Sequence, residues 1–160
     1  MPFQSTKTYG HELGLSVCFR QFGATSHCNR LHGYAVSIKL VFEASELDEN
    51  NWVTDFGNLK EVKSYLEDKF DHKTVVSLND PELWFYRLGQ EKGIMDVVEV
   101  IDIGCEAFAK MVFDFVSLWL RKNRHHPRVD LVSAEVREHG ANSAVFINPK
   151  YDVLHRATDV

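Results

Sequence analysis

Hydrophobic and polar residues alternate along two long stretches near the start of the chain, residues 7–22 and 34–46. An alternation with a period of two is typical of a strand that is buried on one face only. A short polar loop separates the two stretches, which predicts an antiparallel pair of strands. The residues expected to face the core are Leu13, Leu15, Val17 and Phe19 in the first stretch and Val36, Ile38, Leu40 and Phe42 in the second.

Two later stretches show helical spacing, and two more alternate again. Apolar residues recur at helical intervals in residues 59–70 and 106–123, which predicts two amphipathic helices. Residues 128–139 and 144–148 alternate and predict two further strands. The helical residues expected to be buried are Leu59, Val62, Leu66 and Phe70 in the first helix and Phe108, Met111, Phe115, Leu118 and Trp119 in the second.

This order of elements predicts an α+β fold, in which the two helices cover one face of an antiparallel four-stranded sheet. The length of 160 residues favours a single domain over residues 1–160. Residues 73–103 are less regular and are expected to form an insertion between the two helices. Within it, Asp80-Pro81-Glu82 favours the start of a short helix, and residues 95–101 fit either a short strand or another helix.

The composition narrows the class of protein without pointing to an activity. A hydrophobic content of 44% with 26% charged residues is ordinary for a soluble globular protein. The formal net charge of -5 argues against a general nucleic-acid or membrane-surface partner. The 3 cysteines do not suggest a disulfide framework, and the sequence predicts neither a leader segment nor a membrane-spanning run of about 18 apolar residues. We therefore expect a soluble cytoplasmic protein.

The loop between the first two predicted strands is the first candidate for chemistry. It places the thiol of Cys28 between two imidazoles, those of His27 and His32. A cationic or metal-bound neighbour lowers the pKa of a thiol and makes it a better base or nucleophile. The simpler alternative is that Cys28 is a small buried residue and that both histidines lie on the surface.

Three further polar sites lie at the ends of predicted elements, where functional residues are often found. They are the Asp71-His72 pair after the first helix, Glu106 at the start of the second helix, and Glu138 at the end of the third strand. Each has a simpler alternative. The pair fits a helix C-terminus and Glu106 fits a helix N-terminus, because each complements the helix dipole there. Glu138 fits a solvated strand end.

Taken together and in order, these sites match the motifs of a known enzyme family. The chain resembles the 6-pyruvoyl-tetrahydropterin synthase family, which includes the 6-carboxytetrahydropterin synthases of the queuosine and deazapurine pathway. The resemblance covers nearly the whole chain. The matching segments are Cys28-Asn29-Arg30-Leu31-His32-Gly33, Val53-Thr54-Asp55-Phe56, Phe70-Asp71-His72, Cys105-Glu106, Val136-Arg137-Glu138 and Asn142-Ser143-Ala144-Val145-Phe146.

The resemblance implies the tunnelling fold, in which four-stranded sheets join into an oligomeric barrel with active sites between subunits. It implies a homo-oligomer, usually a hexamer built as a dimer of trimers. The implied activity is that of a carbon–oxygen lyase acting on dihydroneopterin triphosphate. Zinc polarises the side-chain hydroxyls of that substrate, proton transfers lead to loss of triphosphate, and the carboxy-forming branch also releases acetaldehyde.

The same resemblance implies roles for the candidate residues. Cys28 would be the general base, and Asp71 with His72 would form the relay that supports proton transfer. Glu138 would anchor the pterin by accepting hydrogen bonds from its N–H and amino groups. Glu106 would be a further substrate-binding residue.

The zinc ligands are where the sequence departs from the family. Three histidines bind zinc in the family, and their positions here are occupied by Phe19, His32 and Tyr34. Only one imidazole remains, whereas a catalytic zinc usually takes three protein ligands. Tyrosine is a poor ligand for this metal.

Other residues of the loop region offer a rebuilt metal site. His27 could supply a second ligand beside His32, and either Cys18 or Cys28 a third. Three interpretations remain open at this point. The chain could be a divergent pterin synthase with a rebuilt zinc site or none, an enzyme for another pterin or purine-like substrate, or a non-catalytic pterin-binding protein.

Overall fold

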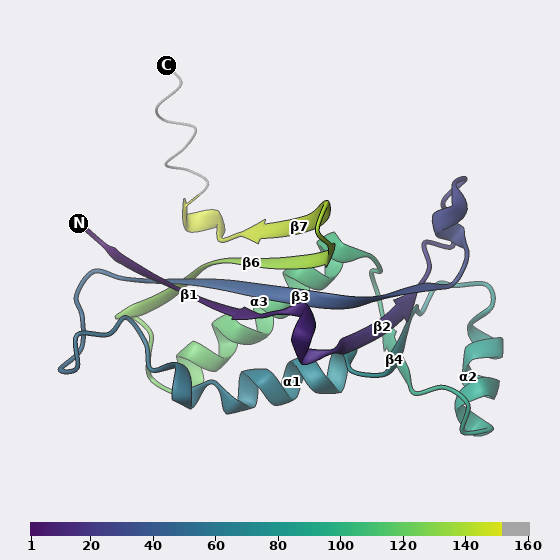
Figure 1. Cartoon of the computed structure of the whole chain (residues 1–160), viewed down its shortest axis with the longest axis horizontal. Coiled ribbons are helices and arrows are strands. Elements are labelled where there is room, and N and C mark those ends of the chain that lie inside the picture. Colours follow the sequence, from purple (N-terminus) through teal and green to yellow (C-terminus); the bar gives the residue numbers. More distant parts are fainter. Residues whose placement is uncertain (152–160) are drawn as a thin grey trace, which may run out of the picture.

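The sheet is built around one long strand, β3 (His32–Ala44), in a computed structural model that describes residues 1–151 (Figure 1). Two shorter strands, β1 (Phe3–Tyr9) and β2 (Leu15–Phe19), follow one another along the same edge of β3 and run antiparallel to it. β6 (Val129–His139) pairs antiparallel with the other edge of β3, and β7 (Asn142–Ile147) pairs antiparallel with β6.

The break between β1 and β2 corrects the expectation of one extended stretch over residues 7–22. A short 3₁₀ turn, His11–Leu13, separates the two strands, and Gly14 after it has a φ of 74°. This left-handed backbone is the conformation that glycine adopts most readily. The expected inward face of the second part is confirmed, because Leu15, Val17 and Phe19 are all buried.

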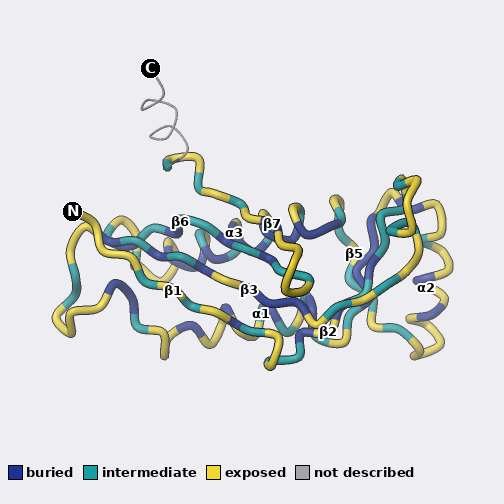
Figure 2. The backbone as a smooth tube through the Cα atoms, turned by 45° about the horizontal axis from the view of Figure 1, so that its top comes forward, coloured by how far each residue is buried: buried dark blue, intermediate teal, exposed yellow. Residues whose placement is uncertain are grey.

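Two helices, α1 (Lys60–Phe70) and α3 (Cys105–Lys122), pack on one face of the sheet, as the sequence predicted (Figures 1 and 2). They contact each other through the stacked rings of Tyr65 and Phe115, whose centroids lie 3.6 Å apart. The hydrophobic core between helices and sheet includes Val36, Ile38, Leu40 and Phe42 of β3, Val62, Leu66 and Phe70 of α1, and Phe108, Val112 and Val116 of α3.

The buried face of α3 differs in part from the one expected. Leu118 was expected in the core but is 51% exposed, whereas Val112 and Val116 are fully buried. Phe108, Val112, Val116 and Leu120 form one row along the helix, because residues four apart lie on the same side. The sequence analysis selected the bulkiest apolar residues of the helix. The residues of this row are the ones buried against the sheet, whatever their size.

The insertion predicted for residues 73–103 widens the same sheet. It contains β4 (Lys73–Ser77), α2 (Leu83–Glu91) and β5 (Val97–Val100). β4 pairs parallel with β2, and β5 pairs parallel with β4, so the strand order is β5-β4-β2-β3-β6-β7 with β1 also on β3. The predicted four-stranded antiparallel sheet is the part from β2 to β7. Residues 152–160 of the predicted domain lie outside the described part of the chain.

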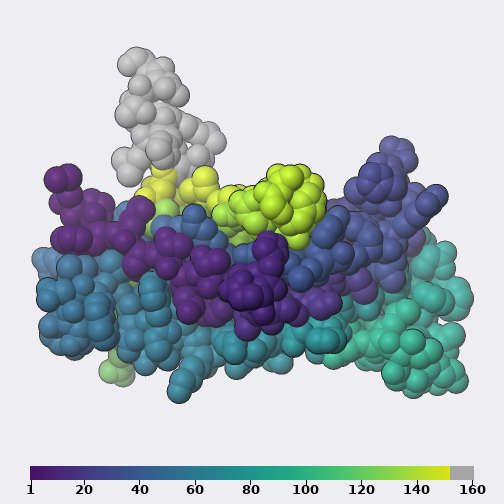
Figure 3. All heavy atoms as spheres, in the orientation of Figure 1, coloured from purple at the N-terminus to yellow at the C-terminus, as the bar shows by residue number. Residues whose placement is uncertain are grey.

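The insertion forms one end of the molecule, opposite the N-terminus (Figure 1). In the space-filling view, the loop that follows β2 and the helix α2 lie at this same end (Figure 3). Among residues 1–151, none of the helices has the length and apolar character needed to cross a membrane. The arrangement therefore places the candidate Cys28 loop beside the insertion.

Candidate active site

A cavity of about 390 Å³ opens where β2, the loop after it, β3, α3 and the β6–β7 hairpin meet. Four of the candidate site residues line it: Cys28, His32, Glu106 and Glu138. The fold thus brings together three sites that are far apart in the sequence. The other lining residues are Phe19, Gln21, Gly104, Cys105, Ala141, Asn142, Ser143 and Ala144.

Cys28 lies in a short 3₁₀ turn, His27–Asn29, within the loop. The hydroxyl of Ser26 accepts a hydrogen bond from the backbone N–H of Cys28 over 3.4 Å. The backbone N–H of Gln21 donates to the carbonyl oxygen of Cys28 over 2.9 Å. Both polar groups of the Cys28 backbone are therefore held, while its half-buried side chain lines the cavity.

His32 begins β3 and lines the same cavity. Its Nδ1 lies 2.7 Å from the carbonyl oxygen of Arg30. A carbonyl oxygen can only accept, so Nδ1 carries the hydrogen of this bond. In the neutral imidazole the lone pair is then on Nε2, which leaves that nitrogen as the acceptor or base.

Glu138 occupies a β-bulge close to the end of β6. Arg137 pairs with Ser143 and His139 pairs with Asn142, so Glu138 has no partner residue on β7. A bulge of this kind turns a side chain away from the regular alternation of the strand. The Glu138 carboxylate reaches the first residue of α3, where the thiol of Cys105 donates to its Oε1 over 3.4 Å.

Cys105 is a site residue to which the sequence analysis assigned no role. Its side chain is buried, and burial is the main cause that raises the pKa of its thiol, with the charge of Glu138 as the next cause. The thiol therefore stays protonated at neutral pH and acts as a hydrogen-bond donor, because only the thiolate is nucleophilic. The one sequence feature that pointed to Cys105 as a cavity residue was its position at the start of α3, next to Glu106.

The Asp71-His72 pair does not line this cavity in the single chain. It follows the end of α1, where Nδ1 of His72 donates to Oδ1 of Asp71 over 2.6 Å. The carboxylate orients the imidazole through Nδ1, and Nε2 has no hydrogen-bond partner among residues 1–151. The His72 side chain is 85% exposed, so the pair presents this nitrogen to the outside of the chain.

The three positions assigned to zinc ligands do lie together in space. Ring centroids are 5.4 Å apart for Phe19 and His32, 5.5 Å for His32 and Tyr34, and 6.2 Å for Phe19 and Tyr34. Phe19 has no atom that can bind a metal. The pKa of the Tyr34 phenol is raised, mainly by burial and next by Glu138, so the phenol stays neutral.

The alternative ligands do not complete a zinc site either. His27 is exposed and is not part of the cavity lining. The thiol of Cys18 lies 3.3 Å from the hydroxyl of Thr74, on the side of the insertion. Across residues 1–151, no group of three or more His, Cys, Asp or Glu side chains is placed to hold a metal ion. The residues present therefore do not fit the three-ligand zinc site that the resemblance implied.

Comparison with known proteins agrees with the motifs. The sequence profile of the 6-pyruvoyl tetrahydropterin synthase family matches residues 9–149. The chain belongs to this family. A 6-carboxy-5,6,7,8-tetrahydropterin synthase from Aquifex aeolicus is 26% identical over 129 residues, which is 72% of this chain and 80% of that protein. The enzyme of the same name from Rickettsia felis is 31% identical over 65 residues, and the match spans 40% of this chain and 47% of that relative, about half its length.

Solved structures share the fold of this chain at low identity. An uncharacterized protein from Wolinella succinogenes superposes with a TM-score of 0.78 at 16% identity, covering 92% of this chain and 99% of that one. The 6-pyruvoyltetrahydropterin synthase of Plasmodium vivax superposes with a TM-score of 0.60 at 14% identity, covering 92% of this chain and 98% of that one. These likenesses confirm the tunnelling fold of the single chain, whereas its assembly into an oligomeric barrel stays a prediction.

Proposed function

We propose that this chain is a pterin-processing lyase that acts on dihydroneopterin triphosphate, as a synthase of the 6-carboxytetrahydropterin or 6-pyruvoyltetrahydropterin type. One observation carries the proposal: Cys28 and Glu138, the proposed base and the proposed anchor, line the same cavity. Family membership and the names of the relatives support it. The cavity volume of about 390 Å³ lies within the range of small-molecule sites.

Glu138 is the proposed anchor for the pterin ring. A carboxylate can accept two parallel hydrogen bonds from the ring N–H and the amino group of a pterin, and such charge-assisted bonds are strong. The thiol of Cys105 uses one acceptor position on Oε1. Each carboxylate oxygen has about two such positions, so both oxygens remain available to a ligand. Glu106, in the first turn of α3, is the proposed second contact.

Cys28 is the proposed base. Its thiolate would take a proton from a carbon of the substrate side chain, and the electrons of that C–H bond would form a double bond. The neighbouring C–O bond would break, and triphosphate would leave with its electron pair. His32 lines the same cavity.

The Asp71-His72 pair is the proposed proton relay, supplied by a second copy of the chain. Its exposed imidazole supports this role, since it points out of its own chain and is oriented by a carboxylate. A homo-oligomer, a hexamer built as a dimer of trimers, would bring the pair to a neighbour's cavity. β7 is an edge strand of the sheet, and an edge of this kind can pair with another chain.

A second candidate function is catalysis on another pterin or purine-like heterocycle without zinc. The observation that favours it is the replacement of two zinc-ligand positions by the rings of Phe19 and Tyr34. A third candidate, a non-catalytic pterin-binding protein, needs Glu138 but gives no role to Cys28 or the Asp71-His72 pair. All three place a small heterocycle in the cavity, with neither nucleic acid nor membrane as partner, in the cytoplasm.

Incubation of the full chain with dihydroneopterin triphosphate tests the proposal. Release of triphosphate, with or without acetaldehyde, supports the lyase and assigns its branch. The assay is run with added zinc and with a chelator. A turnover rate that neither addition changes would agree with the lack of a three-ligand zinc site among the described residues. Pterin binding without turnover would overturn the lyase in favour of one of the other two candidates. No binding at all would overturn the lyase and the pterin-binding protein, and would leave only an enzyme for another heterocycle.

A further inference from the structure

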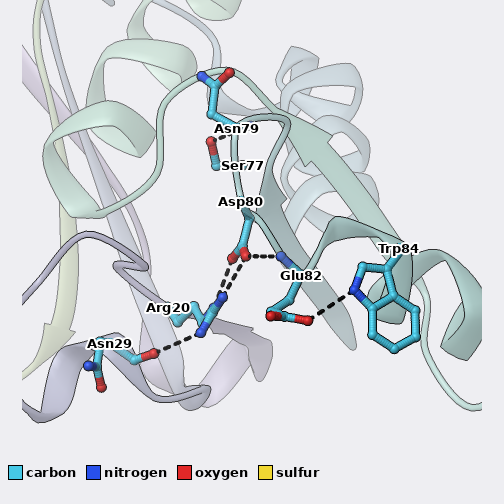
Figure 4. A network of polar contacts seen from close by, with 7 residues as sticks. All are labelled: Arg20, Asn29, Ser77, Asn79, Asp80, Glu82 and Trp84. Atoms are coloured by element: carbon cyan, nitrogen blue, oxygen red, sulfur yellow. Dashed lines mark hydrogen bonds and ion pairs between the residues drawn. The ribbon is translucent and has the colours of Figure 1, made fainter.

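Arg20, directly after β2, contacts both the insertion and the Cys28 loop (Figure 4). Its Nε and Nη2 donate to the two carboxylate oxygens of Asp80, over 2.8 and 2.5 Å. Its Nη1 donates to the carbonyl oxygen of Asn29 over 3.3 Å. One guanidinium group therefore joins the turn before α2 to the residue that follows Cys28.

Gln21, the next residue, makes a second bridge of the same kind. Its side-chain Nε2 donates to the carbonyl oxygen of Ile103, the last residue of the insertion, over 2.7 Å. Its backbone N–H donates to the carbonyl oxygen of Cys28 over 2.9 Å. Two consecutive residues thus hold the carbonyl groups of Cys28 and Asn29 and tie them to two points of the insertion, Asp80 and Ile103.

We propose that Arg20 and Gln21 are positioning residues, through which the insertion of residues 73–103 sets the place of the Cys28 thiol in the cavity. The catalytic meaning of that placement rests on the proposed function, in which Cys28 is the base. The placement itself is a property of the chain and can be measured without any turnover.

The Arg20–Asp80 pair is built to hold a fixed geometry. The Asp80 side chain is 1% exposed and that of Arg20 is 20% exposed, so water screens the pair little. The backbone N–H of Glu82 also donates to Oδ1 of Asp80, over 2.8 Å (Figure 4). A planar guanidinium makes two parallel bonds to a carboxylate, which the single ammonium of a lysine cannot reproduce.

A second ion pair in the insertion provides a matched control. Nε and Nη2 of Arg87 in α2 donate to the carboxylate of Glu99 in β5, over 2.7 and 2.8 Å. This pair has the same two-bond geometry but makes no contact with the loop of Cys28 among the hydrogen bonds of the described residues. Loss of it would loosen the insertion without releasing either bridge.

The test compares Arg20→Lys, Asp80→Asn and Gln21→Ala with Arg87→Lys in the full chain. The rate at which iodoacetamide alkylates Cys28 is measured by mass spectrometry across a pH series. The buried Cys105 in the same sample reports global opening. We expect Cys28 to react about fivefold faster or more in the three bridge variants, with Cys105 unchanged, because only local structure opens. Arg87→Lys should leave Cys28 within about twofold of wild type.

Two results would overturn the proposal: an unchanged Cys28 rate in all three variants, or equal acceleration of Cys28 and Cys105. The second result would mean a general loss of stability. Gln21→Ala leaves the buried ion pair intact, so it gives an answer even if the charge variants fail to fold. A selective change at Cys28 in a chain that turns over no pterin would leave this inference standing and remove the proposed lyase. With turnover, kcat should fall more than KM changes.

Discussion

The thiol of Cys105 donates a hydrogen bond to the carboxylate of Glu138, which joins the first residue of α3 to the bulge of β6. The bond spans 3.4 Å and lies at the wall of the cavity that also contains Cys28. Glu138, the proposed anchor, therefore has a fixed hydrogen-bond donor beside it. Because that donor is the titratable thiol of Cys105, a residue of the cavity wall contributes to the pH dependence of the free energy of unfolding.

Removal of the Cys105 thiol should lower the free energy of unfolding less at alkaline pH than at neutral pH. The pKa of this thiol is raised above its ordinary value of 9.0, so the folded chain keeps a proton that the unfolded chain releases as the pH passes 9.0. Its contribution to stability is complete below that value and is lost as the pH rises further. The difference in free energy of unfolding between wild type and Cys105→Ala should shrink by about 1 kcal/mol per pH unit above it. Urea titrations at several pH values measure this, and a constant difference would contradict it.

Substitution of Glu138 should weaken pterin binding more than it slows the chemical step. Glu138→Gln removes the charge and one of two acceptors, so the dissociation constant should rise about ten- to a hundredfold. Titration of pterin fluorescence measures it. Glu61→Gln, on the exposed first turn of α1, is the matched control and should bind as wild type. Equal binding by Glu138→Gln would remove the anchor assignment.

Substitution of Cys28 should have the opposite effect. Cys28→Ala should abolish release of triphosphate while the pterin dissociation constant stays within about threefold of wild type, because the base takes no part in holding the ring. Cys18→Ala is the control, since this thiol faces Thr74 of the insertion and does not line the cavity. Full activity in Cys28→Ala would show that another group is the base.

The clustered rings at the former ligand positions allow a gain-of-metal test. The double variant Phe19→His with Tyr34→His would place three imidazoles where centroids are now 5.4 to 6.2 Å apart. We expect it to retain about one zinc per chain after dialysis, as three protein ligands suffice. Wild type and the single variant Phe19→His should retain little. Metal analysis of untagged protein decides, and stoichiometric zinc in wild type would refute our interpretation of the donor set.

Gly104, directly before α3, should not tolerate a side chain. Its φ is 111°, which glycine alone adopts readily, and an added Cβ would lie 2.4 Å from Nε2 of Gln21. Gly104→Ala should lower the free energy of unfolding by about 2 kcal/mol. Gly140→Ala provides the comparison, because an added Cβ there meets nothing within 4 Å. Thermal melts of the two variants measure the difference, and equal melting temperatures would contradict it.

The sequence predicted those parts of the fold that local pattern determines. Alternation identified the inward face of β2 and β3, and helical spacing placed α1 and α3, because these patterns arise from one buried face. The site residues Cys28, His32, Glu106 and Glu138 were found because each lies at an element end and carries a family motif. Whether they act as proposed is still a prediction.

The rest of the site depends on contacts that no local pattern reveals. The parallel pairing of β4 with β2 joins segments that are far apart in the chain. β4 has only five residues, which is too short for a clear alternation of polar and apolar positions. The sequence likewise gives no sign that Arg20 and Asp80 form a pair, because both look like ordinary charged surface residues. Only the fold shows that the Asp80 carboxylate is buried. The role of Cys105 depends on the bulge at Glu138, which only the strand register defines.

The double bridge from Arg20 and Gln21 has an evolutionary consequence. Both side chains find their acceptors, the carboxylate of Asp80 and the carbonyl of Ile103, inside the segment between α1 and α3. Relatives in which this insertion is short would lack the Asp80 carboxylate, so they must hold their cysteine turn by other contacts. An arginine directly after the second strand should therefore be inherited together with a long insertion and be lost where the insertion is short.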